Sequence, residues 1–167
     1  MYDVIVACCR WLENTPWGAT IRDSSWMQPV VLWVHFIGLS LWLATSLAVD
    51  LRLIGVGARR HTATELSNRL AVWKWIGFSV AFVAGVLLLS AEATVYVTNT
   101  GFLLKLGVLA PLALIWHVVV QKKTRAWTEE GHTSPIGQWA GVLELLLWAL
   151  VVAASVGYLL TNAVTRS

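Results

Sequence analysis

The sequence predicts an all-α protein, a polytopic membrane four-helix bundle with an N-terminal interfacial amphipathic helix. Of 167 residues, 57% are hydrophobic and only 13% are charged, whereas soluble domains carry about 25% charged residues. The apolar residues gather in four runs, each as long as the roughly 20 residues that a helix needs to cross a bilayer. Several of the eleven tryptophans lie near the ends of these runs, which is typical of aromatic belts at membrane surfaces.

The chain is expected to have three parts: an outer-surface segment (1–28), a membrane domain (29–161) and a short tail (162–167). In the first part Val4, Ile5, Cys8 and Trp11 recur at helical spacing, which predicts an amphipathic helix in the headgroup layer. The four spans are expected over about 29–56, 72–97, 102–121 and 139–161. Cys8 and Cys9 are adjacent, so a disulfide between them would be strained and is not expected.

The basic residues predict how the helices are oriented. The segments 57–71 and 122–137 lie on one side of the membrane and, with Lys74, hold seven basic residues: Arg59, Arg60, Arg69, Lys74, Lys122, Lys123 and Arg125. The other side holds three, Arg10, Arg22 and Arg166. The positive-inside rule makes the first side cytoplasmic and places both termini outside. This role accounts for the basic composition without nucleic acid as a partner.

The ionisable residues within the spans fall into two layers. The outer layer holds His35, Glu92 and Lys105, and the inner layer holds Asp50, Arg52, His117 and Glu144. A charge in hydrocarbon costs roughly 2.5–3.5 kcal/mol on insertion scales, so pairing within a layer is expected. The natural pairs are Glu92 with Lys105, and Arg52 or His117 with Asp50 or Glu144. These residues either hold the helices together or form a site.

His35 is the main candidate for a ligand site, because it stands inside the charge-free run from Val30 to Val49 and lipid offers its ring nitrogens no partner. Imidazole and a neutral amine both bind metals. His35 and Lys105 are therefore candidate axial ligands of a haem iron, in an apolar slot that Gly38, Trp42 and Gly107 are suitably placed to line.

Two helices resemble those of a known group of membrane proteins. The segment H-F-I-G-L-S-L-W-L-A-T-S-L-A-V-D-L-R-L, from His35 to Leu53, resembles the first conserved helix of HemJ-type membrane protoporphyrinogen oxidases. Residues 102–121, with Lys105-Leu106 and then His117, resemble their lysine-bearing helix. The same features are similar to CopD-like copper-resistance proteins, and the wider pattern resembles uncharacterised four-helix bacterial proteins of the CopD-like/HemJ-like superfamily.

This resemblance implies b-haem bound by His35 and Lys105. With the orientation predicted from the basic residues, we expect a protein of the bacterial inner membrane with periplasmic termini. Such a protein would be an electron-transfer protein or part of a membrane oxidoreductase, with a quinone or a redox protein as its partner. Two alternatives stay open. The first is copper handling by His35, Met27 and the Cys8–Cys9 pair. The second is a structural accessory subunit of a membrane complex. We also expect the chain to form a homo-oligomer or to join such a complex, since either would cover part of its apolar surface.

Overall fold

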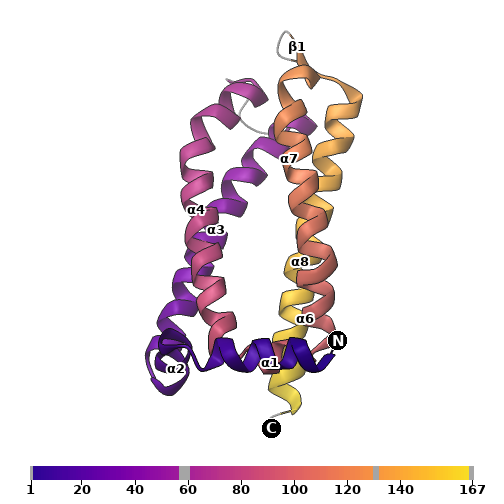
Figure 1. Ribbon diagram of the computed structural model, residues 1–167. Coiled ribbons are helices and arrows are strands. Elements are labelled where there is room, and N and C mark those ends of the chain that lie inside the picture. The colour runs from indigo at the N-terminus through magenta and orange to yellow at the C-terminus, as the bar shows by residue number, and fades with distance from the viewer. Residues whose placement is uncertain (1, 57–60, 130–131, 166–167) are drawn as a thin grey trace. The chain divides into compact units, whose positions relative to one another are not determined.

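The computed structural model describes residues 2–56, 61–129 and 132–165. Its helices are α1 (Tyr2–Glu13), α2 (Pro16–Asp23), α3 (Met27–Ile54), α4 (Ala63–Ala91), α5 (Ala93–Thr98), α6 (Thr100–Leu104), the π-helical turn η1 (Lys105–Leu109), α7 (Ala110–Trp127) and α8 (Pro135–Thr165). Between α7 and α8, β1 (Thr128–Glu129) pairs antiparallel with β2 (His132–Thr133). The expected all-α fold is confirmed (Figure 1).

Four helices are long and apolar enough to cross a membrane: Met27–Ile54, Ala63–Ala91, Thr100–Trp127 and Pro135–Ser155. The number of expected spans is confirmed, but their bounds differ from those expected. The second helix begins at Ala63 and not near residue 72, and α8 continues to Thr165, into the expected tail. Arg59, Arg60 and Arg166, which the topology prediction uses, lie outside the described residues.

The early start of α4 has a local cause. The amide of Thr62 donates to the carboxylate of Glu65 (3.0 Å), and the amide of Glu65 donates to the Thr62 hydroxyl (3.1 Å). This reciprocal capping box satisfies two amides that would otherwise lack partners at the first turn. Arg69 and Lys74 therefore belong to α4, and Lys74 is buried there, so Lys74 is not the flanking charge that the topology prediction assumed.

The end of α3 is fixed by glycine. Gly55 has φ +94°, a left-handed conformation that side chains other than glycine rarely adopt. The amides of Gly55 and Val56 donate to the carbonyls of Arg52 (3.2 Å) and Leu51 (2.8 Å). These are the two hydrogen bonds of a Schellman motif, which stops the helix.

The third span contains one irregular turn. In η1 the amide of Ala110 donates to the carbonyl of Lys105, five residues back. Pro111 follows, and since proline has no amide hydrogen it cannot donate to the carbonyl of Gly107 as an α-helical residue would. The missing donor accounts for a wider turn at this place.

The chain forms two compact units, and α3 and α4 contribute to both of them. Unit 1 consists of Met1–Leu43 and Trp73–Leu103, and unit 2 of Ala44–Val72 and Leu104–Ser167. Of the expected polar layers, His35 and Glu92 belong to unit 1, and the remaining members belong to unit 2.

In unit 1, α1 and α2 lie crosswise to the neighbouring parts of α3 and α4 (Figure 1). The Glu13 carboxylate accepts hydrogen bonds from the Thr94 amide (2.7 Å) and hydroxyl (2.6 Å), so α1 is tied to the first turn of α5. A Cβ at Gly18 would lie 2.7 Å from the Ser90 carbonyl oxygen, which means that α2 packs directly on the end of α4. The predicted N-terminal helix is confirmed, and its place at a membrane surface stays a prediction.

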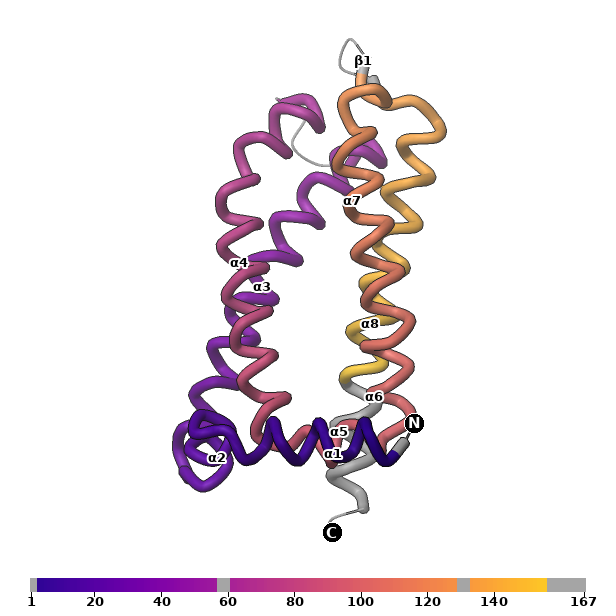
Figure 2. The backbone as a smooth tube through the Cα atoms, viewed as in Figure 1, coloured from indigo at the N-terminus to yellow at the C-terminus, as the bar shows by residue number. Residues whose placement is uncertain are grey.

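In unit 2, α7 and α8 run side by side (Figure 2) and pack with the end of α3 and the start of α4. The buried apolar core contains residues from all four of these helices: Val49, Leu53, Ala63, Val120 and Ala140. The Trp116 indole donates to the carbonyl of Ala140 (3.1 Å), which links α7 and α8 next to the polar pair described below.

The outward surfaces of the long helices are apolar. Trp33, Trp75 and Trp139 are 69%, 62% and 73% exposed, and large aliphatic side chains are exposed on all four spans. Apolar exposure on this scale marks a surface that meets lipid or another protein. The exposed Trp26, Trp73, Trp75 and Trp139 are consistent with the expected aromatic belts.

Candidate functional site

His35 is held by the backbone of the neighbouring helix. Its Nδ1 lies 2.7 Å from the carbonyl oxygen of Ala81 on α4. A carbonyl oxygen can only accept, so Nδ1 carries the hydrogen and donates it, and the lone pair of the neutral ring lies on Nε2. This is the arrangement in which histidines usually bind metals, with the second nitrogen held by a carbonyl or carboxylate.

Small residues on α4 make this contact possible. A Cβ at Gly85 would lie 3.0 Å from His35 Cε1, and a Cβ at Gly77 would lie 2.7 Å from the Trp42 amide nitrogen. Gly77, Ala81 and Gly85 follow one another at four-residue spacing, so they form one face of α4. Small residues repeated at this spacing let two membrane helices approach at backbone distance.

Two residues expected to line a cofactor slot have other neighbours. A Cβ at Gly38 would lie 2.5 Å from the Ala81 amide nitrogen and 2.9 Å from the Gly77 carbonyl oxygen. The space beside Gly38 is therefore filled by the backbone of α4. Trp42 is 5% exposed, and its ring meets that of Phe78 edge to face, with centroids 5.4 Å apart. In unit 1 Gly38 and Trp42 serve the contact between α3 and α4.

The two residues expected to pair or to ligate with Lys105 belong to the other unit. His35 and Glu92 lie in unit 1, and Lys105 lies in unit 2. Glu92 stands at the bend between α4 and α5, where its backbone carbonyl accepts from the amides of Val95 and Tyr96. Lys105 opens the π-helical turn. The Glu92–Lys105 pair and joint ligation by His35 and Lys105 stay predictions.

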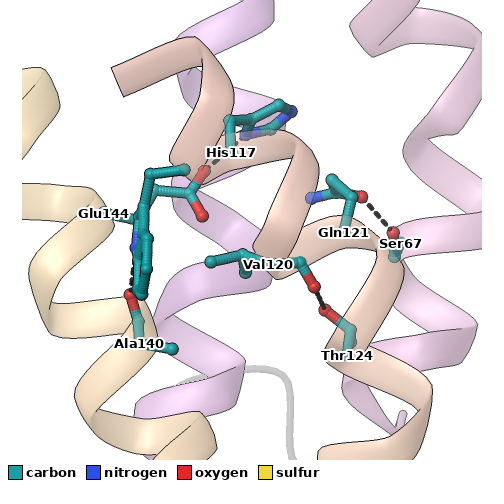
Figure 3. Close-up of polar contacts among 8 residues, drawn as sticks. Ser67, His117, Val120, Gln121, Thr124, Ala140 and Glu144 are labelled. Carbon is teal, nitrogen blue, oxygen red and sulfur yellow. Dashed lines mark hydrogen bonds and ion pairs between the residues drawn. The ribbon is translucent and has the colours of Figure 1, made fainter. Parts of the chain in front are cut away.

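The inner layer contains a buried acid–base pair. His117 on α7 is hydrogen-bonded through Nδ1 to Oε1 of Glu144 on α8, as Figure 3 shows. Glu144 is 0% exposed and His117 7% exposed. This pair was one of the combinations expected from matched depth in the membrane, and it is confirmed. The second oxygen of Glu144, Oε2, has no hydrogen-bond partner among the described residues.

The other inner-layer residues lie on α3. Arg52 donates through Nε to the carbonyl of His61 (2.6 Å), which ties the end of α3 to the segment before α4. Asp50 is 1% exposed, and its backbone carbonyl oxygen lies 3.2 Å from the position of a Cβ at Gly141. Helices α3 and α8 therefore touch where Asp50 meets Gly141, and Gly141 lies about one helical turn before Glu144 on α8.

The residues expected to bind copper are not gathered into a cluster. Cys8 and Cys9 are both free thiols. Within the described part of the chain, no group of three or more histidine, cysteine or acidic side chains is arranged to hold a metal ion. A haem iron differs in this respect, because the porphyrin supplies most of its ligands and the protein one or two.

The part of α4 that surrounds His35, with the Ala81 carbonyl and the space at Gly85, was not predicted from the sequence. The sequence does contain a signal for this contact. Small residues repeat at four-residue spacing within an apolar run, at Gly77, Ala81 and Gly85, and this pattern is typical of tight helix contacts in membranes. What the pattern does not reveal is the partner, because Ala81 lies 46 residues from His35 in the chain.

The four long apolar helices and their lipid-like surface define this chain as a multi-pass integral membrane protein. Neither a family model nor a curated protein nor a solved structure was found to match it. Any more particular function is therefore a matter of its own residues.

Proposed function

We propose that this membrane protein binds b-type haem through His35 and serves in electron transfer. The observation that supports the proposal is the hydrogen bond from His35 Nδ1 to the carbonyl of Ala81. It places a hydrogen on Nδ1, so that a neutral ring has its lone pair on Nε2, and it holds the orientation of the ring. His35 lies within a membrane span, where a neutral donor is favoured over a charged one.

The donor set fits haem better than a bare metal ion. Haem requires one or two axial donors in an apolar surrounding, and His35 meets that requirement alone. Gly85 leaves room for the imidazole, since a Cβ there would lie 3.0 Å from Cε1. Lys105 stays the second donor that the resemblance implies; it stands at a π-helical turn, a feature frequent at functional sites.

Bound haem would supply a centre that gains and loses one electron. The chain's own residues would then do two things. His35 would bind the iron through Nε2, while Ala81 would keep the Nδ1 hydrogen in place. The tight packing of α3 on α4 at Gly38 and Gly77 would keep water and lipid away from that side of the imidazole.

A haem assay tests the proposal. The full chain is produced with ample haem supply, purified, and analysed by the pyridine-haemochrome method and visible spectroscopy. The wild type is expected to hold stoichiometric b-haem, and His35→Ala to lower the haem-to-protein ratio about tenfold or more, since even the partner of a metal ligand contributes 10–100-fold. Lys105→Met is expected to retain haem with a five-coordinate spectrum.

His61→Ala is the matched control, because His61 is a partly exposed histidine outside the spans, and its haem content should equal that of the wild type. Gly85→Ala should alter the spectrum, because its new methyl group would press on the His35 ring. A wild-type protein without haem would refute the proposal and leave copper handling or a structural role. Equal losses in His35→Ala and His61→Ala would exclude His35 as the ligand.

A further inference from the structure

The buried pair of His117 and Glu144 has a second property that packing alone does not require. Figure 3 shows the two side chains facing each other from α7 and α8. One carboxylate oxygen of Glu144 accepts from the imidazole, and Oε2 is buried with no hydrogen-bond partner among the described residues. Buried polar atoms are normally satisfied, and an exception in a membrane span calls for a reason.

The pair has two protonation states that differ by one proton. With a neutral imidazole and an ionised carboxylate its net charge is −1, and one added proton brings the net charge to zero. A net charge inside hydrocarbon is costly, whereas a neutral hydrogen-bonded pair is tolerated. Oε2 of Glu144 is a free acceptor position at which such a proton can be carried.

Polar side chains continue from the pair toward the end of α7. Gln121 lies one helical turn beyond His117, and its Oε1 accepts from the Ser67 hydroxyl on α4 (2.8 Å). The Gln121 amide nitrogen is buried without a hydrogen-bond partner in the described structure. Figure 3 shows Gln121 and Ser67 facing each other, one turn along α7 from His117.

We propose that His117 and Glu144 form a proton-binding site inside the membrane span, and that it exchanges protons with water at the α7–α8 connection. In uptake, a proton from water forms an O–H bond at Oε2 of Glu144, and the hydrogen bond between Nδ1 and Oε1 is kept. Release reverses this step, and no other bond changes. The site is independent of His35 and haem, because it uses none of the same residues.

The other charged groups of unit 2 must be distinguished from this pair. On α3 these are Asp50, which is buried, and Arg52, which is bonded to the His61 carbonyl. On α4 they are Glu65, in the capping box, and the exposed Arg69. On the third span they are Lys105 and the exposed residues Lys122, Lys123 and Arg125. Outside the spans, Glu129 lies in β1, His132 in β2 and His61 just before α4. Asp50 and Glu65 are the two carboxyl groups that serve as internal controls.

Infrared difference spectroscopy of the full chain in lipid nanodiscs tests the proposal. Spectra are recorded between about pH 4 and pH 9, the range over which carboxyl and imidazole groups ordinarily titrate. The wild type is expected to show the carbonyl stretching band of a protonated buried carboxyl group, and Glu144→Gln to lose it. Asp50→Asn and Glu65→Gln should keep it. His117→Gln should also keep the band, because Glu144 still carries the proton.

Glu144→Gln retains an oxygen that can accept from His117, so the fold is expected to survive. Should that variant fail to fold, the wild-type chain with ¹⁵N-labelled histidine gives the same answer: the His117 ring nitrogens must change their shifts with pH. A band that persists in Glu144→Gln, or vanishes in Asp50→Asn instead, would overturn the proposal. So would constant His117 shifts over the whole range, because the pair would then be fixed.

Discussion

At the scale of single residues, the two histidines within the spans are held by different acceptors. His35 donates to an uncharged backbone carbonyl, which places a hydrogen on Nδ1 and leaves Nε2 as the nitrogen with the lone pair when the ring is neutral. His117 faces a carboxylate, and a hydrogen bond to a charged group is stronger and accommodates either ring state. The first environment suits a ligand that must stay neutral. The second suits a hydrogen-bonded pair in which Glu144 gains and loses a proton.

A prediction at this scale concerns Cys9. Partial burial raises the pKa of the Cys9 thiol, and the nearby Glu13 carboxylate and Cys8 raise it further. A raised pKa means that less of the thiol is ionised at neutral pH, and only the thiolate is nucleophilic. We expect Cys9 in the Cys8→Ser variant to react slowly with iodoacetamide at pH 7 and steadily faster as the pH rises.

Mass spectrometry of the alkylated protein gives the rates. The exposed Cys8, measured in the Cys9→Ser variant, is the comparison, and it should react faster at pH 7. Replacing Glu13 by Gln in the Cys8→Ser background should speed the reaction of Cys9, because one cause of the raised pKa is removed. Equal rates for the two cysteines at all pH values would contradict the prediction.

At the scale of elements, the contact between α3 and α4 depends on two glycines, Gly38 and Gly77. At each of them a Cβ atom would collide with the backbone of the facing helix. We expect Gly77→Ala to destabilise the protein by about 1–3 kcal/mol, the usual cost of overpacking a tight contact, because its methyl group would lie 2.7 Å from the Trp42 nitrogen. Unfolding in mixed micelles with increasing SDS, followed by circular dichroism, measures this loss.

Gly107→Ala is the matched control, since nothing described lies within 4 Å of a Cβ at Gly107. Alanine is also the better helix former, so this variant should equal the wild type or exceed it slightly. If both glycine variants lose the same stability, the effect arises from glycine replacement in general and not from the contact.

The sequence was sufficient for the elements whose signals are local. Four apolar runs predict four spans, because the hydropathy of a run is read directly from its own residues. Matched depth within these spans made His117 with Glu144 one of the expected pairs, but it did not single this pair out from those with Arg52 or Asp50. The start of α4 was placed too late because residues 63–71 are polar, although Thr62 and Glu65 form a recognisable capping box. The role of Gly38 was not predictable from α3 alone, since it depends on which face of α4 lies opposite.

At the scale of the whole molecule, the orientation in the membrane can be tested. Of the seven basic residues counted on the expected cytoplasmic side, six remain when the buried Lys74 is left out. The other side holds three. We expect both termini outside. In a Cys8→Ser, Cys9→Ser background, cysteines introduced at Thr62 and Thr128 should resist a membrane-impermeant maleimide applied from the periplasm, and one at Asp3 should react. The reverse labelling pattern would show the opposite orientation.

The π-helical turn has a consequence for the faces of the third span. Lys105 and His117 are twelve residues apart, and at about 100° per residue an unbroken α-helix would place them roughly 120° apart around its axis. The wide turn takes up nearly the rotation of one residue, which brings the two side chains to within roughly 20° of the same direction. Lys105 is partly buried and His117 buried, in agreement with a shared inward side. A single surplus residue thus aligns two chemically useful groups that regular helical geometry would have separated.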